Sequence, residues 1–154
     1  MRNRSLTTVK EMQRYLYGSL SDLYDSHLLK DADKGAEIIK EKIETGKKIR
    51  IISDYDVDGV SSNYILYQGL KRCGADVDYK IPDRVEDGYG INEHLIEKAA
   101  GDGIDTIITC DNGIAAAEQI AYGNSLGLTL IVTDHHDIPF QKENDEITYL
   151  LPPA

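Results

Sequence analysis

The sequence predicts an α/β fold in which a parallel sheet of four to five strands carries helices on both faces. Short β-branched apolar runs alternate with longer segments whose apolar residues recur at helical spacing. Strands that alternate with helices in this way imply right-handed crossovers and a doubly wound parallel sheet. A continuous apolar run such as 128–132 is typical of a strand buried on both faces.

Residues 1–30 are predicted to form a helical segment and residues 31–154 the α/β domain. In the first segment, apolar residues recur at roughly helical spacing on either side of Gly18, which indicates two short helices. With 154 residues, of which 41% are hydrophobic, the chain is long enough for one domain with a substantial core.

The helices of the domain are predicted from apolar stripes that end at a glycine. The first stripe begins where Asp33 can cap it and ends before Gly46, which predicts a helix over 33–45. The other expected elements, in chain order, are a strand at 48–53, a helix at 59–72, a strand at 77–81, a helix at 92–100, a strand at 106–109, a helix at 114–126, a strand at 128–132 and a fifth strand at 147–151.

Acidic residues follow three of the predicted strands at the point where each strand ends. The carboxyl ends of parallel strands meet at one edge of the sheet, and that edge holds the site in open α/β folds. We therefore expect one rim to carry the side chains of Asp54, Asp56, Asp58, Asp111, Asp134, His135 and His136.

Several carboxylates in one cleft repel each other strongly. Two of them about 4 Å apart repel by roughly 4 kcal/mol at an effective dielectric constant near 20, so divalent cations are expected between them. Mixed carboxylate and imidazole ligands suit Mn²⁺ better than Ca²⁺, and the lack of cysteine ligands disfavours structural zinc. A calcium loop is disfavoured further, because Ile65 stands where such a loop requires a glutamate.

Each acidic cluster taken alone has an ordinary explanation. A single D-x-D is most often a solvated turn, and Asp-Asn-Gly is most often a turn or a helix cap. The Asp134-His135-His136 sequence fits a capped loop as well as it fits a pair of ligands. Their joint occurrence at three strand ends favours the metal site, because turn chemistry gives no reason for aspartate at each of them.

The net charge of −10 argues against a protein that grips nucleic acid through a broad basic face. It does not exclude an enzyme that acts on nucleic acid, because bound cations make an aspartate-rich site locally positive.

The chain has no run of 18 apolar residues and begins with polar residues, so we expect a soluble, unexported protein without membrane partners. Cys73 and Cys110 lack a C-x-x-C spacing and are predicted to be free thiols in the reducing cytoplasm.

The chain contains ten tyrosines, one phenylalanine and no tryptophan. Tyr55 and Tyr89 lie on the proposed rim, where they are suited to stacking on a base. Tyr64 and Tyr67 fall on the apolar stripe of their helix and are expected in the core.

Three motifs in this order resemble those of the DHH phosphoesterase superfamily: DYDVDGV at 54–60, TCDNGI at 109–114 and TDHH at 133–136. Within the superfamily they are most similar to the RecJ branch, whose members are exonucleases specific for single-stranded DNA. The segment PDRVEDGYGIN at 82–92 adds to this similarity. The resemblance covers roughly residues 20–140.

The resemblance implies a two-metal phosphodiesterase that uses Mn²⁺, with Mg²⁺ as the alternative. Arg84 would bind phosphate through its bidentate fork, although a surface salt bridge explains an isolated arginine equally well. By the same resemblance, Asp56 and Asp58 would each bind one ion, Asp111 would bridge the two ions, and His135 would complete the shell of the second. Asp54 would replace the histidine that related pyrophosphatases use to bind the first ion. His136 would contact the scissile phosphate, and Asp134 would orient an imidazole.

By this resemblance, the expected function is 5′-to-3′ degradation of single-stranded DNA in DNA repair and recombination, with a single-strand-binding protein or a helicase as partner. The family has a fourth acidic motif and a second domain that are not found within residues 1–154, so we expect the chain to be poorly active alone. The enzymatic alternative is a DHH phosphodiesterase acting on oligoribonucleotides or cyclic dinucleotides. A non-catalytic binding subunit is the alternative of another class.

Overall fold

The chain, seen in a computed structural model, is described here over residues 5–85, 87–143 and 146–152. It divides into two compact units, Met1–Glu37 and Ile38–Ala154. The boundary that the sequence predicts, between residues 30 and 31, stays a prediction. None of the helices in the described ranges is both long and apolar enough to cross a membrane.

The α-helix α1 (Val9–Tyr17) lies within the first unit. A reciprocal capping box starts it, because Thr8 Oγ1 accepts the backbone N–H of Glu11 at 3.2 Å and the Glu11 carboxylate accepts that of Thr8 at 2.9 Å. No residue of α1 is buried.

The second predicted helix of this unit is replaced by two single 3₁₀ turns, η2 (Leu20–Asp22) and η3 (Ser26–Leu28). Aspartate side chains compete for the backbone here: the Asp22 carboxylate accepts the N–H of Ser19 at 2.9 Å, and the Asp25 carboxylate accepts that of His27 at 3.0 Å. Such local side-chain bonds favour caps and turns over a continuing helix.

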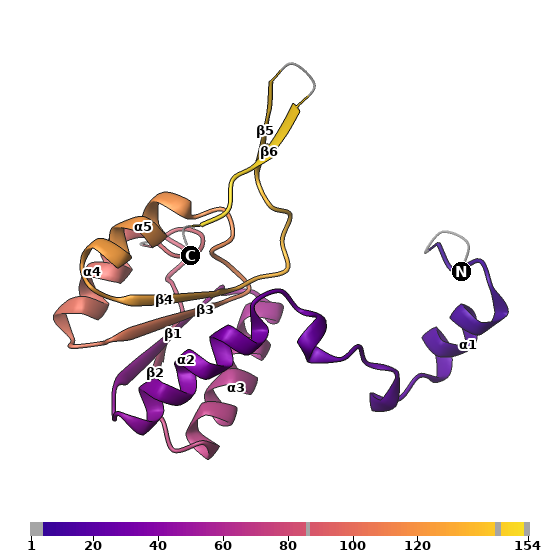
Figure 1. Cartoon of the computed structure of the whole chain (residues 1–154), viewed down its shortest axis with the longest axis horizontal. Helices are drawn as coiled ribbons and strands as arrows, with labels where there is room; N and C mark the ends of the chain where they lie inside the picture. The colour runs from indigo at the N-terminus through magenta and orange to yellow at the C-terminus, as the bar shows by residue number, and fades with distance from the viewer. Residues whose placement is uncertain (1–4, 86, 144–145, 153–154) are drawn as a thin grey trace. The chain divides into compact units, whose positions relative to one another are not determined.

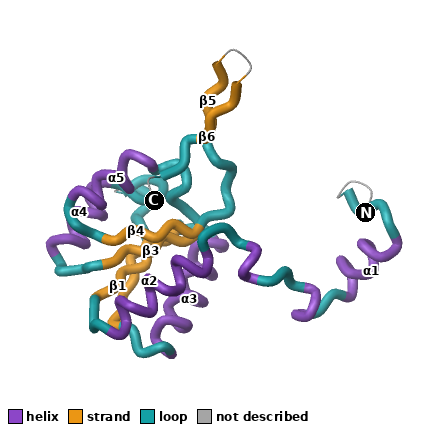
Figure 2. Tube along the Cα trace, in the orientation of Figure 1, coloured by secondary structure: helices purple, strands orange, loops and turns teal. Residues whose placement is uncertain are grey.

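The second unit is built on a four-stranded parallel sheet with the strand order β2-β1-β3-β4. This confirms the predicted fold class. Figure 2 shows the strands as orange tubes crossing the centre of the unit. Their bounds are Lys48–Ser53 for β1, Asp76–Lys80 for β2, Thr106–Cys110 for β3 and Thr129–Thr133 for β4.

Helices cover both faces of the sheet, as Figure 1 shows, with α2 and α3 on one face and α4 and α5 on the other. Each of the four lies at or near a predicted helical segment. Their bounds are Ala32–Glu44 for α2, Val57–Arg72 for α3, Glu93–Gly101 for α4 and Ala117–Ser125 for α5.

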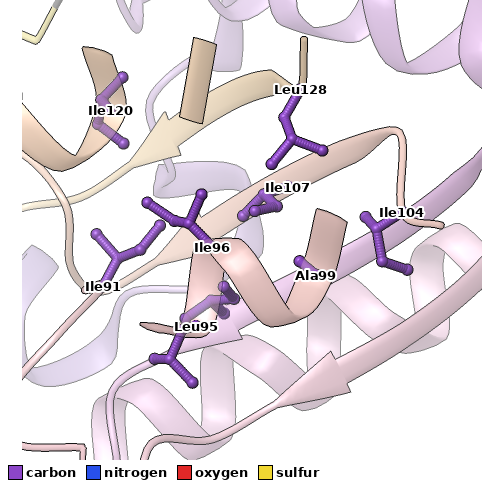
Figure 3. Close-up of a cluster of buried hydrophobic side chains, with 9 residues drawn as sticks. Ile91, Leu95, Ile96, Ala99, Ile104, Ile107, Ile120 and Leu128 are labelled. Carbon is purple, nitrogen blue, oxygen red and sulfur yellow. The ribbon is translucent and has the colours of Figure 1, made fainter. Parts of the chain in front are cut away.

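Two hydrophobic clusters lie on the two sides of the sheet. Successive strand residues point to opposite faces. Ile107 therefore joins the cluster under α4 and α5, and Ile108 joins the cluster under α2 and α3. Figure 3 shows the first cluster, in which Leu95, Ile96 and Ala99 of α4 gather beside Ile107 and residues of the neighbouring loops and helix. The sheet is thus held from both sides, which keeps its strand ends in place.

The segment predicted as a fifth strand does not join the main sheet. It forms β6 (Glu146–Tyr149), which pairs antiparallel with β5 (Phe140–Glu143) in a separate two-stranded sheet. Strands close in sequence can pair antiparallel directly, whereas a further parallel strand needs a long crossover connection. The prediction that residues 147–151 add to the parallel sheet is therefore wrong.

Candidate metal centre

The ends of β1, β3 and β4 lie side by side at one edge of the sheet. Ser53 pairs with Cys110, and Cys110 pairs with Thr133, so the last residues of the three strands are in register. The residues that follow them in the chain, Asp54, Asp111 and Asp134, therefore leave the sheet at the same level.

Asp54 and Asp56 occupy the turn between β1 and α3. Asp54 is buried, with 2% of its surface exposed. Asp56 caps α3, because its Oδ1 accepts the backbone N–H of Gly59 at 2.9 Å, and this hydrogen bond is the main cause of the lowered pKa of Asp56. A Cβ atom at Gly59 would lie 2.4 Å from the backbone oxygen of Asp54. Glycine thus allows α3 to begin directly against the end of β1.

Asp111 follows β3 in a left-handed backbone conformation, with φ of 62°. Its N–H donates to the carbonyl of Thr133 at 3.1 Å, which continues the β3–β4 ladder by one bond. The residue is 7% exposed. Burial, followed by the neighbouring Asp56 carboxylate, raises the pKa of Asp111.

The loop after β4 is held by the buried carboxylate of Asp134. One of its oxygens accepts the backbone N–H of Ile114 at 3.0 Å, and the other lies 2.6 Å from Nδ1 of His136. Burial raises the pKa of Asp134, but these hydrogen bonds outweigh burial and leave the pKa lowered. The same contact raises the pKa of His136.

In the part of the chain that the structure describes, acidic and imidazole side chains form two groups of three, each with its donor atoms within 4.8 Å of one another. Both groups contain Asp111. Nε2 of His135 lies 2.8 Å from Oδ1 of Asp111. A carboxylate shared between two adjacent donor groups is the arrangement that a bridged pair of cations requires. The groups are Asp54, Asp56 and Asp111, and Asp111, His135 and His136.

Buried carboxylate oxygens inside these groups fit a divalent cation. In the described ranges, the buried Oδ1 atom of Asp54 has no hydrogen-bond partner. Oδ1 of Asp111 is buried as well, and it faces Nε2 of His135 at 2.8 Å. Buried, unpaired carboxylate oxygens are costly, and a cation bound to oxygen and nitrogen donors would remove that cost.

The structure does not bring every predicted ligand into the two groups. Asp58 lies exposed in the first turn of α3 and belongs to neither group. Residues 54–58 do not form one extended stretch, because the Asp56 cap starts α3 at Val57 instead of at the predicted residue 59. The roles of Asp58 as a ligand and of His136 as a phosphate contact stay predictions.

A row of aromatic and basic side chains borders the groups. The Arg84 guanidinium carbon lies 5.5 Å from the centre of the Tyr55 ring. The Tyr55 and Tyr89 rings meet edge to face at 6.3 Å, and the Tyr89 hydroxyl lies 3.3 Å from Nε2 of His136. A continuous series of contacts therefore runs from Arg84 through Tyr55 and Tyr89 to His136.

Sequence reasoning missed the contribution of Asp87, which organises the loop that presents Arg84 and Tyr89. Its carboxylate accepts the N–H of Asp83 at 2.8 Å and lies 3.6 Å from the Lys80 ammonium. The only local signal was an acid among turn residues, which does not distinguish a loop anchor from a solvated charge.

Comparisons with known proteins agree with this geometry. Residues 48–154 match the family described as DHH family, N-terminal domain. The single-stranded-DNA-specific exonuclease RecJ of Bacillus subtilis (strain 168) is 38% identical over 134 residues, and that of Escherichia coli (strain K12) is 32% identical over 135 residues. Each alignment covers 87% of this chain but only 17% and 23%, respectively, of the two relatives.

Solved structures are similar as well. A crystal structure of exonuclease RecJ bound to manganese matches with a TM-score of 0.63 and 36% identity, over 68% of this chain and 27% of that one. The structure of RecJ in complex with Mn²⁺ from Thermus thermophilus matches with a TM-score of 0.61 and 32% identity, over 71% of this chain and 15% of that one. The present chain thus corresponds to a small part of each.

Proposed function

Because the chain belongs to the DHH family, we propose that it is the phosphodiesterase unit of a RecJ-like exonuclease that hydrolyses single-stranded DNA from its 5′ end with two Mn²⁺ ions. The observation that carries this proposal is Asp111, a buried carboxylate shared by two adjacent donor groups. Mg²⁺ is the alternative metal. DNA repair and recombination as the process, the cytoplasm as the location, and a single-strand-binding protein or helicase as partner stay predictions.

The proposed division of labour follows from the geometry of the two groups. Divalent ions bound there would supply a water of lowered pKa and neutralise the charge of the phosphate. Asp54 and Asp56 would hold one ion, His135 the other, and Asp111 both. Asp58 is proposed as a further ligand by family resemblance alone.

His136 is proposed to contact the scissile phosphate. Asp134 engages its Nδ1 at 2.6 Å, so that Nε2 faces the rim, where it lies near the Tyr89 hydroxyl. A ring held in this way needs little reorientation when substrate arrives, which lowers the entropic cost of reaching the reactive geometry. Asp134 would thus act by orienting His136.

Arg84, Tyr55 and Tyr89 are proposed to bind the nucleotide beside the scissile bond. Tyr55 and Tyr89 offer aromatic rings for a base, and the exposed Arg84 offers a planar guanidinium for a phosphate. Arg84 contacts Tyr55, Tyr55 contacts Tyr89, and Tyr89 contacts His136 of the second metal group. Affinity is expected to be weak, because the chain carries a net charge of −10.

We expect slow hydrolysis by the chain alone. The side chains of His135 and His136 are 69% and 46% exposed, so water has open access and the phosphate is poorly fixed. Incubation at high protein concentration with Mn²⁺ and 5′-labelled oligonucleotides measures this, with Asp56→Ala as the control for contaminating nucleases.

The expected result is slow, Mn²⁺-dependent release of mononucleotides from single-stranded DNA, little from duplex DNA, and none in the Asp56→Ala variant. Hydrolysis of a cyclic dinucleotide in preference to the oligonucleotide would contradict the proposed substrate. Rapid, processive degradation of DNA would contradict the proposed weak activity of the open site.

A further inference from the structure

Asn112 places a buried amide beneath the metal groups. It is 1% exposed, and its Nδ2 donates to the carbonyls of Ile52 and Cys110, each at 3.1 Å. Two acceptors determine the orientation of the amide, because the reversed orientation would set Oδ1 against two carbonyl oxygens. The two N–H donors of one side chain therefore join two segments of backbone.

The two accepting carbonyls belong to neighbouring strands, at the ends that carry the acidic residues. Ile52 belongs to β1 and lies two residues before Asp54. Cys110 is the last residue of β3 and directly precedes Asp111. The β1–β3 pairing ends at Ser53 and Cys110. The amide of Asn112 thus continues the connection between β1 and β3 at the level where the ladder stops.

Two unfavourable features accompany this connection. Asp111 keeps the left-handed backbone that glycine adopts more readily, and Oδ1 of Asn112 is buried without a hydrogen-bond partner among the residues that the structure describes. An apolar residue at position 112 would avoid the second cost. That an amide stands there indicates that its two donated bonds matter to the site above it.

We propose that Asn112 is a positioning residue for the metal-binding carboxylates, which it aligns by joining the ends of β1 and β3. The inference rests on the proposed function, because it presumes that Asp54 and Asp111 bind cations. Asn112 acts through the backbone from which Asp54 and Asp111 project, since both of its donated bonds end on main-chain carbonyls.

The test compares two buried asparagines at the same end of the sheet. Asn63 is 3% exposed and donates to Oγ of Ser53 at 2.9 Å, so this amide bond reaches one strand only. Asn112→Ala and Asn63→Ala are made in the full chain, and Mn²⁺ binding is titrated through the electron paramagnetic resonance signal of the free ion, at a temperature where circular dichroism shows all proteins folded.

The expected result is a rise of the Mn²⁺ dissociation constant by about tenfold in Asn112→Ala, the low end for residues that orient metal ligands. In Asn63→Ala the dissociation constant should stay unchanged even where the melting temperature falls. If Asn112→Ala does not fold, Asn112→Ser is measured, because its hydroxyl can serve one of the two carbonyls and should give an intermediate loss.

Two results would overturn the inference while leaving the proposed function intact. The first is an Asn112 variant that folds and binds Mn²⁺ as tightly as the parent. The second is an equal loss of affinity in Asn63→Ala, which would show a general effect of removing a buried amide. A parent chain that binds no Mn²⁺ would overturn the proposed function and this inference together.

Discussion

Among single residues, Asp111 combines the features that a shared ligand requires. It is buried, it belongs to both donor groups, and its Oδ1 faces Nε2 of His135 at 2.8 Å. Burial and the nearby Asp56 carboxylate raise its pKa, so the ion-free site holds unfavourable negative charge. A bound cation relieves this charge, which links metal binding to the stability of the fold.

We predict that Mn²⁺ raises the melting temperature and that Asp111→Ala removes most of the increase. At a concentration one hundred times its dissociation constant, a ligand stabilises the folded state by about 2.7 kcal/mol. The matched control is Asp137→Ala, because Asp137 is exposed and belongs to neither group. Thermal unfolding with and without Mn²⁺ measures the effect, and equal shifts in parent and Asp111→Ala would exclude a shared-ligand role.

Within the secondary-structure elements, the start of α3 sets the distance between Asp54 and Asp56. Gly59 lies in the first turn, where a side chain would meet the backbone of Asp54, and it also donates to Asp56. Gly69 lies in the same helix, and a Cβ atom there would meet nothing within 4 Å beyond its own helix backbone. The two glycines therefore differ in what surrounds them.

We predict opposite effects of alanine at these positions. Gly59→Ala should destabilise the fold by about 1–3 kcal/mol through overpacking against Asp54. Gly69→Ala should stabilise it by about 0.5–1 kcal/mol, because alanine favours a helix. Urea unfolding of both variants gives the two free energies, and a neutral Gly59→Ala would mean that the close approach of α3 to β1 is not required.

Away from the metal groups, Arg50 on β1 contacts Asp78 of β2 at 2.7 Å and Asp102 after α4 at 2.8 Å. The hydrogen bond from Arg50 lowers the pKa of Asp102. A carboxylate with a lowered folded-state pKa contributes stability above its unfolded pKa, and that contribution is lost as the pH falls through the folded value.

Arg50→Gln should therefore lower the melting temperature at pH 7, and the difference from the parent should shrink as the pH falls below the ordinary aspartate pKa of about 3.9. Arg72→Gln is the control, since Arg72 is exposed at the end of α3. A difference from the parent that stays constant across this pH range would show that the ion pairs are not its cause.

For the whole molecule, the two units contribute differently to stability. None of the residues in α1, η2 or η3 is buried, whereas every member of both hydrophobic clusters lies between residues 39 and 132. Hydrophobic burial is the main stabilising contribution to a fold, so the second unit holds most of the stability. The metal groups also lie entirely within it.

We predict that removing residues 1–30 leaves the melting temperature and Mn²⁺ binding of the chain unchanged. The deleted segment contains no buried residue in its described helices, so little apolar surface returns to water. Calorimetry and a Mn²⁺ titration of the shortened chain check this. A clear drop in either quantity would show that the first unit supports the second.

Much of the second unit follows from local patterns. Apolar runs predicted the four parallel strands, and stripes ending at Gly46, Gly74 and Gly127 predicted where helices stop. The rim was also predictable, because parallel strands deliver their carboxyl ends to one edge. The expectations that failed include one element, the fifth parallel strand, and two side chains: Asp33 lies inside α2 instead of capping it, and Tyr64, expected in the core, is 65% exposed.

The sequence by itself determined the fold class and the edge of the sheet on which the acidic residues gather, because periodicity and strand ends are local properties. Only the tertiary structure decided which of those residues meet. The register of β1 and β3 brings Asp54 and Asp111 together, and the cap at Asp56 places Asp58 in the first turn of α3. The buried amide of Asn112 joins the ends of two strands. The register and the bridge by Asn112 depend on contacts between segments far apart in the chain, which no local pattern encodes, whereas the cap at Asp56 is a local contact with Gly59.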